Sequence, residues 1–232
     1  MGKWIRIGIL TLIGGLIGAL IIYSIVHKSG IESSVWDAGT TIGDPETAEL
    51  HYVQYSDLAC PYCDVFTRLI VENEEDFKNF LAEHKILYEI RMTEMIYDST
   101  KSTLSRNGNI ASYCALNEGK FIEYYHAAVM KLYEDYHSKG IGDTKTSPMI
   151  DPLPISYWLE IGHNLGLGET FDTCVENEEP LEKIIANTKR ATQTAQGLPY
   201  FAFGKFKQAG FDNTWDYEYV KYYLEAGLPT TK

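Results

Sequence analysis

The segment Cys60-Pro61-Tyr62-Cys63 constrains this chain most, because of where it stands. A strand-like run, Leu50 to Tyr55, precedes it, and a helix-like run begins at Asp64. A thiol at a helix N-terminus is favoured as its thiolate, because unpaired N–H groups and the helix dipole stabilise negative charge there. Proline suits the first helical turn, where no N–H is needed. The pattern therefore predicts a redox dithiol at a strand-to-helix junction.

The N-terminus predicts a membrane anchor. Residues 7–26 are twenty uncharged residues rich in Ile, Leu and Gly, preceded by Lys3 and Arg6. As a helix they span about 30 Å, the thickness of the hydrocarbon core of a bilayer. The basic residues favour a cytoplasmic N-terminus, which places the rest of the chain outside the cytoplasm. We interpret residues 1–28 as an uncleaved single-pass anchor; a cleaved signal peptide is the alternative.

The remaining composition predicts one extracytoplasmic domain. Residues 29–48 contain Ser, Gly, Thr, Asp and Pro and few large apolar groups, so they are interpreted as a tether, and residues 49–232 suffice for a single core. The net charge of −12 argues against nucleic acid as a partner.

Two further cysteines, Cys114 and Cys174, complete an even number. In an oxidising compartment they are candidates for a structural disulfide. The alternative is that both are small buried apolar residues.

The hydrophobic pattern predicts a β-α-β half, a helical block at about residues 100–196, and a β-β-α half, which together make a split α/β domain with an insertion. The expected strands are Leu50–Tyr55, Lys85–Met92, Tyr200–Phe203 and Phe206–Phe211. One expected helix begins at Asp64, and a loop is expected at His137–Pro152. The other expected helices are Glu74–His84, Ile110–Leu116, Phe121–Tyr136, Ile155–Leu165, Glu169–Val175, Leu181–Gln196 and Trp215–Ala226. The tyrosines, Tyr124 and Tyr125 among them, are interpreted as packing residues of helices.

These residues resemble a known family. The segment from Val53 to Cys63 looks like the active-site segment of DsbA-like thiol:disulfide oxidoreductases of the thioredoxin superfamily. Tyr113-Cys114-Ala115 and Phe171-Asp172-Thr173-Cys174 match its helical insertion, and Gly197-Leu198-Pro199-Tyr200-Phe201 matches the segment that holds its cis-proline. The resemblance implies a thioredoxin-like fold with a helical insertion.

It also implies roles for individual residues. Cys60, exposed at the helix start, is expected to carry the mixed disulfide with substrate, and the more buried Cys63 to resolve it. Pro199 is expected to be cis and to face the dithiol, although an ordinary trans proline at a strand start is the alternative. Leu198 would offer its backbone to an extended substrate, alongside Pro61 and Tyr62 of the motif.

Three positions depart from the family pattern. Gln54 stands where many relatives have an acid that moves a proton to or from the buried thiol, which leaves water or Asp57 for that task. Tyr62 is neutral where strongly oxidising relatives have His, so we expect a less oxidising disulfide. Leu198 replaces a small or β-branched residue, which predicts a different substrate preference.

The resulting hypothesis is a membrane-anchored oxidase that introduces disulfides into newly translocated or unfolded proteins. We expect a monomer that needs no cofactor and is re-oxidised by a membrane redox partner. No metal site is expected, since the six histidines show no pair at ligand spacing and none flanks the dithiol in sequence. A disulfide reductase and a non-catalytic thioredoxin-like module that holds Cu(I) or a protein partner remain alternatives.

Overall fold

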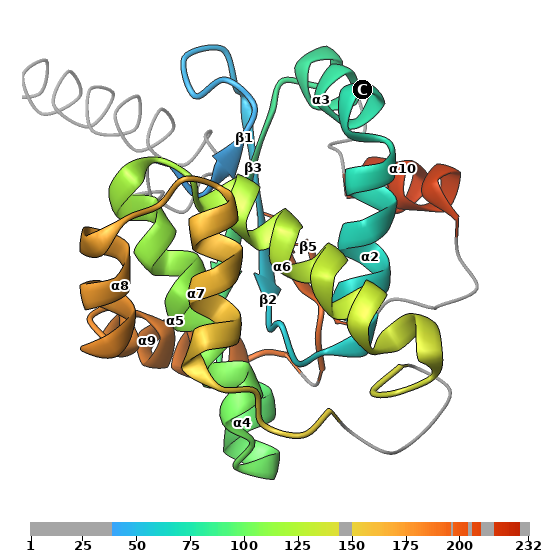
Figure 1. Ribbon diagram of the computed structural model, residues 1–232. Helices are drawn as coiled ribbons and strands as arrows, with labels where there is room; N and C mark the ends of the chain where they lie inside the picture. The colour runs from blue at the N-terminus through green and yellow to red at the C-terminus, as the bar shows by residue number, and fades with distance from the viewer. Residues whose placement is uncertain (1–38, 144–149, 196, 204–205, 210–215, 228–232) are drawn as a thin grey trace, which may run out of the picture. The chain divides into compact units, whose positions relative to one another are not determined.

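The computed structural model describes residues 39–143, 150–195, 197–203, 206–209 and 216–227, and Figure 1 shows a central sheet with helices around it. The strands are β1 (Thr41–Ile42), β2 (Leu50–Ser56), β3 (Ile86–Met92), β4 (Tyr200–Phe203) and β5 (Phe206–Ala209). Their order in the sheet is β1-β3-β2-β4-β5. The helices outside the insertion are α2 (Pro61–Glu72), α3 (Glu74–Glu83) and α10 (Tyr217–Glu225).

The sheet combines parallel and antiparallel pairs as the sequence predicted. Strands β2 and β3 are parallel, which is the pairing that a β-α-β unit produces. Strand β4 runs antiparallel to β2, and β5 antiparallel to β4. All seven residues of β3 are buried, so this β-branched and aromatic strand lies in the interior of the domain. The α/β thioredoxin-like fold is confirmed.

The insertion consists of α4 (Met95–Thr100), α5 (Thr103–Ala115), α6 (Phe121–Asp135), α7 (Ile155–Asn164), α8 (Glu169–Glu176) and α9 (Leu181–Thr192), with short 3-10 turns η1 (Leu116–Glu118) and η2 (His137–Lys139). Ten of the thirteen residues of α5 are buried, so this helix is the centre of the insertion. In Figure 1, α6 runs between the group of α5 and α7 and the first helix, α2, and it packs against all three.

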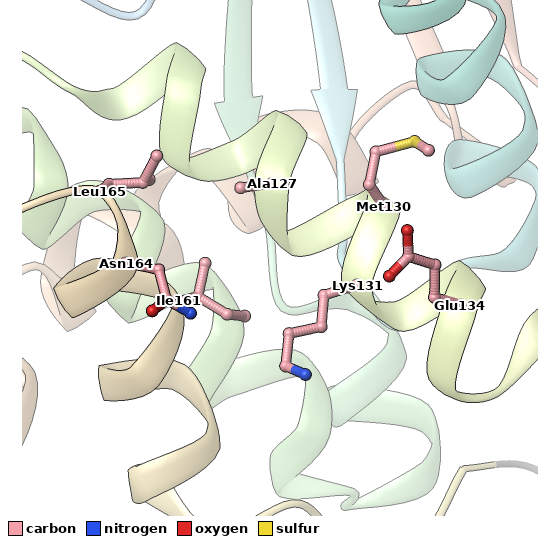
Figure 2. A pocket seen from close by; sticks show the side chains of 7 residues that line it. All are labelled: Ala127, Met130, Lys131, Glu134, Ile161, Asn164 and Leu165. Atoms are coloured by element: carbon pink, nitrogen blue, oxygen red, sulfur yellow. The ribbon is translucent and has the colours of Figure 1, made fainter.

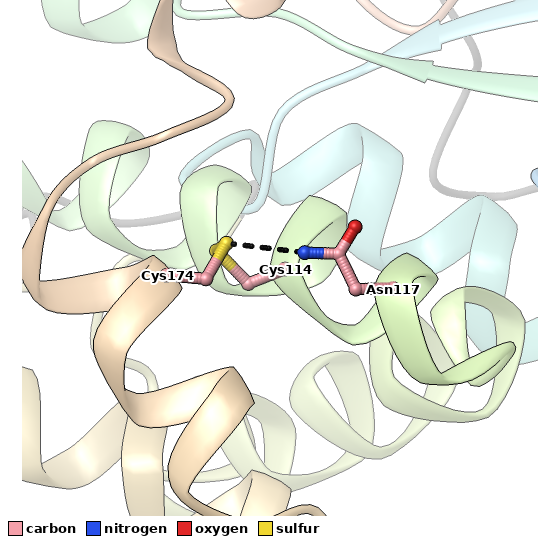
Figure 3. The surroundings of a disulfide bond; sticks show 3 residues. All are labelled: Cys114, Asn117 and Cys174. Carbon is pink, nitrogen blue, oxygen red and sulfur yellow. Dashed lines mark hydrogen bonds between the residues drawn. A yellow bond between two sulfur atoms is a disulfide. The ribbon is translucent and has the colours of Figure 1, made fainter.

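A disulfide joins two helices of the insertion. Cys114 near the end of α5 is bonded to Cys174 in α8, with their Cα atoms 5.7 Å apart. Asn117 of η1 donates its side-chain amide to the Cys174 sulfur at 3.7 Å (Figure 3). Of the two alternatives that the sequence left open, the structure therefore contains the disulfide.

Some boundaries differ from those expected. Thr41–Ile42, in the predicted tether, pairs antiparallel with β3, so the folded domain begins before residue 49. Helix α5 begins at Thr103 rather than Ile110, because Ser102 caps it by accepting from the Leu104 N–H. Helix α4 was not expected, and part of the predicted loop at His137–Pro152 forms η2.

The predicted membrane span, residues 7–26, lies outside the described residues. Within the part of the chain that the structure describes, no helix combines the length and the apolar character needed to cross a membrane.

Candidate functional site

The dithiol lies at the start of α2. Cys60 is the N-cap residue with an extended backbone (φ −90°, ψ 112°), and Pro61 is the first helical residue. The Cys60 sulfur accepts a hydrogen bond from the Cys63 N–H at 3.4 Å. Both cysteines are free thiols. The helix start therefore places Cys60 where N–H groups of the first turn face its sulfur, as the sequence predicted.

Both sulfurs are buried, which the sequence predicted for Cys63 alone. Cys63 is 1% exposed, and Cys60, expected at the surface, is only 4% exposed. The reason is a small apolar cluster of residues from β2, the segment before β4 and the end of α9, to which both cysteines belong. Its other members are Val53, Tyr55, Ala191, Leu198 and Tyr200. Tyr62 is the outward residue of the motif, at 37% exposed.

The segment before β4 meets the dithiol. The Leu198–Pro199 peptide bond is cis, as the resemblance implies. Antiparallel pairing of Tyr200 with Tyr55 brings this segment to the end of β2 from which the motif follows. Leu198, 8% exposed, lies in the same cluster as both cysteines. The structure thus brings together the motif and the cis-proline segment, which lie far apart in sequence.

Opposing effects act on the pKa of the Cys63 thiol. Burial raises this pKa well above its usual range, and the neighbouring Cys60 thiol raises it further. Hydrogen bonds to the Cys63 sulfur from the Asp57 backbone N–H and the Ser56 hydroxyl act in the other direction. The thiolate of Cys63 is therefore costly to form and depends on these donors.

Asp57 is a buried carboxyl in the loop between β2 and the motif. It is fully buried, and burial raises its pKa to about 6 although four hydrogen bonds to it act in the opposite direction. Its oxygens accept from the backbone N–H groups of Ala59 (3.0 Å) and Ile96 (3.1 Å), and from the side chains of Ser105 (2.7 Å) and Asn109 (3.3 Å). Asp57 therefore fastens the loop before the dithiol to α4 and α5 of the insertion.

His137 reaches the motif helix although it is distant from the dithiol in sequence. Its Nδ1 lies 3.1 Å from the Asp64 carboxylate, one residue after Cys63. The other Asp64 oxygen accepts from Arg68 at 3.0 Å, whose guanidinium lies 3.8 Å from the centre of the Tyr133 ring. No sequence signal indicated this contact, since it depends on how η2 packs against α2.

A second charged cluster lies on β2 and β3. Glu89 accepts two hydrogen bonds from Arg91, at 2.6 and 2.9 Å, and its carboxylate lies 2.7 Å from His51. Burial alone would raise the pKa of Glu89, but these partners hold it below its usual value. Arg91 also donates to the Tyr55 hydroxyl at 3.3 Å, which connects the ion pair to the cluster around the dithiol.

A groove of about 380 Å³ lies in the insertion between α6 and α7. Figure 2 shows its lining residues, Ala127, Met130, Lys131, Glu134, Ile161, Asn164 and Leu165, none of which belongs to the dithiol site. Among the described residues, no group of three or more His, Cys, Asp and Glu side chains is gathered as a metal site would need. A soft ion that accepts two thiolates would be held by Cys60 and Cys63.

The comparisons with known proteins agree with this geometry. The thioredoxin family model matches residues 37–198. Among solved structures, alpha-DsbA1 of Wolbachia pipientis superimposes with a TM-score of 0.58 at 15% identity, over 85% of this chain and 94% of its own. The thiol-disulfide exchange protein alpha-DsbA2 of the same organism gives 0.55 at 17% identity, over 88% and 92%.

MdbA of Corynebacterium diphtheriae, a thiol-disulfide oxidoreductase, gives a TM-score of 0.56 at 11% identity, over 82% of this chain and 91% of its own. At such identities these likenesses concern the fold. A search of curated proteins finds no match.

Fold and site together define a class: a thioredoxin-superfamily protein with a dithiol at a helix N-terminus, whose fold is similar to those of DsbA-type proteins. A dithiol at a helix N-terminus, beside a cis-proline segment and next to a helical insertion, is the arrangement on which this statement rests. The chain belongs to the thioredoxin family, whose model covers the dithiol and the whole insertion.

Proposed function

We propose that the protein acts as a disulfide oxidase on unfolded or newly translocated proteins outside the cytoplasm. The observation that carries the proposal is the placing of Cys60 at the N-terminus of α2 beside Leu198 and the cis-Pro199. The segment before β4 offers an extended substrate a backbone to pair with, while Pro61 and Tyr62 flank the attacked sulfur.

The electrons balance in two exchange steps. A substrate thiolate attacks the Cys60 sulfur of the oxidised pair; a new sulfur–sulfur bond forms, and Cys63 leaves as a thiolate that takes up a proton. A second substrate thiolate then attacks the substrate sulfur of this mixed disulfide, and Cys60 leaves. The substrate loses two electrons and gains a disulfide, and Cys60 and Cys63 become a dithiol, which a membrane redox partner re-oxidises.

The location is also part of the proposal. Residues 7–26 would anchor the chain with its N-terminus in the cytoplasm and the domain on the other side. The Cys114–Cys174 disulfide supports this location, since structural disulfides persist in oxidising compartments. We propose a monomer, because no dimerisation segment stands out in the sequence.

A redox equilibrium of the purified protein against glutathione buffers tests the direction of electron flow. A potential above about −200 mV for the Cys60–Cys63 pair places it with disulfide donors, and the neutral Tyr62 predicts a value below that of the strongest oxidants. A potential near or below about −270 mV would make it a reductase that awaits a donor. If the thiols never exchange, both the oxidase and the reductase are excluded, and the remaining hypothesis is a module that holds Cu(I) or binds a protein partner.

The Cys60→Ser variant separates catalysis from binding. If oxidation of a reduced substrate is lost while the variant still binds that substrate, the enzyme hypothesis holds. If the intact protein shows no turnover either, the binding module is favoured.

A further inference from the structure

Three buried hydroxyl groups are linked to one another by hydrogen bonds, and one of them, that of Ser56, acts on the Cys63 thiol. They belong to Ser56 at the end of β2, Thr67 one helical turn after Cys63, and Tyr125 of α6. The Tyr125 oxygen lies 2.7 Å from the Ser56 oxygen and 2.8 Å from the Thr67 oxygen. Ser56 and Tyr125 are fully buried and Thr67 is 2% exposed. Tyr125 thus bridges the two other hydroxyls at a site closed to bulk water.

The hydrogens of this group can all point toward the sulfur. When Cys63 is a thiolate it only accepts, so Ser56 donates its hydrogen to the sulfur. Tyr125 then donates to Ser56, and Thr67 donates to Tyr125. Each group uses its single hydrogen once; Ser56 and Tyr125 also accept one hydrogen bond each, and Thr67 is the end of the chain. Such a chain strengthens its terminal bond, because each donor polarises its neighbour in a low-dielectric interior.

The position at which many relatives carry a buried acid holds Gln54 in this chain. Gln54, fully buried on β2, accepts from the Tyr88 hydroxyl at 2.6 Å, and its Nε2 has no hydrogen-bond partner among the described residues. Tyr88 and Tyr125 keep their protons near neutral pH, since burial raises the pKa of both hydroxyls. They are donors and not bases.

The other titratable groups near Cys63 lie elsewhere. Cys60 lies at the same helix start as Cys63. The Asp57 carboxylate, whose pKa burial raises to about 6, already accepts hydrogen bonds from Ala59, Ile96, Ser105 and Asn109. Asp64, the residue after Cys63, is paired with His137 at 3.1 Å and with Arg68 at 3.0 Å.

We propose that Ser56, Tyr125 and Thr67 form a relay of hydroxyl donors that stabilises the thiolate of Cys63 as leaving group, in place of a buried acid. The proposal rests on the proposed exchange function. In this proposal Ser56 donates to the Cys63 sulfur, whereas Tyr125 and Thr67 are positioning residues that act through Ser56. A helix of the insertion therefore takes part in the chemistry of the dithiol.

The experiment follows the reaction of the reduced full-length protein with Ellman's reagent by stopped flow, after confirming two free thiols per chain. In the first phase the Cys60 thiolate attacks the reagent and releases one thionitrobenzoate. In the second phase the Cys63 thiolate attacks the Cys60 sulfur, releases another, and leaves a protein disulfide. The rate of the second phase against pH reports the ionisation of Cys63 alone.

We expect Ser56→Ala to slow the second phase about tenfold at neutral pH and to move its pH midpoint up by about one unit, the scale of a hydrogen bond to a charged group. Tyr125→Phe should slow it about threefold with a smaller upward movement. Tyr124→Phe is the matched control: Tyr124 is equally buried on the same helix and donates to the Trp158 carbonyl, away from the dithiol.

Combining the substitutions tests the serial order. If Tyr125 acts through Ser56, the Ser56→Ala/Tyr125→Phe double variant is no slower than Ser56→Ala alone. An unchanged second-phase pH profile in both single variants would overturn the relay, as would full additivity of their effects. A missing first phase in the unmodified protein would instead contradict the proposed exchange function, so the two failures are distinguishable.

Discussion

The buried carboxyl of Asp57 makes the stability of this domain depend on pH in a way that one substitution removes. Asp57 is fully buried, accepts hydrogen bonds from Ser105 and Asn109, and has a pKa raised from 3.8 to about 6 by burial. Asp57→Asn keeps the shape and abolishes the titration. It also removes an acceptor, which lowers stability by about 1–3 kcal/mol independently of pH.

The sign and size of this pH dependence follow from the difference between the pKa values of Asp57 in the folded and unfolded states. Because its pKa is higher in the folded state, Asp57 binds its proton more tightly when folded, so this group favours folding below about pH 4 and loses that contribution as the pH rises through about 6. Two pKa values that differ by about 2 correspond to about 3 kcal/mol in total. Between pH 4 and pH 7 the stability of the unmodified protein should therefore fall by about 2–3 kcal/mol relative to Asp57→Asn.

Urea unfolding of both proteins at a series of pH values measures this difference. The comparison is needed because His126 titrates in the opposite sense: burial lowers its pKa to about 4, so its contribution is lost as the pH falls. This contribution is common to both proteins and cancels. Ser105→Ala should make the stability fall more steeply with rising pH, since the Ser105 hydroxyl lowers the pKa of Asp57. A difference between the proteins that stays constant within about 0.5 kcal/mol would refute the reasoning.

Three further outcomes are expected. Leu198→Thr shrinks a side chain that packs in the same cluster as the dithiol, and removes about 1–2 kcal/mol of the free energy gained by burying it. Cys60 should then be about five- to thirtyfold more accessible, which Ellman's reagent would report as a faster first phase. An unchanged rate would contradict this prediction. Replacing both Cys114 and Cys174 by Ala opens a loop of 60 residues and should lower stability by about 4 kcal/mol in urea unfolding, with a loss below about 1 kcal/mol counting against it. Cys60→Ser should abolish the first phase, whereas a retained phase would show that the Cys63 thiolate is the one that attacks the reagent.

The parts of the fold that sequence predicted are those with strong local signals. Strand β3 has apolar or aromatic residues at alternating positions, Ile86, Tyr88, Ile90 and Met92, and the motif marks the start of α2 through Pro61. The cis peptide before Pro199 was open in the residues alone, and the family resemblance favoured it. The pairing of Cys114 with Cys174 was also open, and the even number of cysteines and the oxidising compartment made it a candidate.

The parts that sequence missed depend on tertiary contacts. Strand β1 has two residues in a polar segment, and only its partner β3 makes it a strand. The first half of α5 was not predicted as helix, since it contains polar residues such as Ser105 and Asn109, and both of these turn inward to Asp57. The burial of Cys60 depends on Leu198, which is 138 residues further along the chain by its number and meets it only in the fold.

The insertion is more than a cover for the sheet, because it supplies polar partners at three points around the dithiol. Tyr125 of α6 bonds to Ser56, which acts on Cys63, His137 of η2 contacts Asp64 just after Cys63, and Ser105 of α5 holds Asp57 just before the motif. None of these contacts is apolar packing, and each requires its helix at one position relative to α2. Local opening of the insertion should therefore change the reactivity of the dithiol before the sheet unfolds, which links the stability of these helices to exchange.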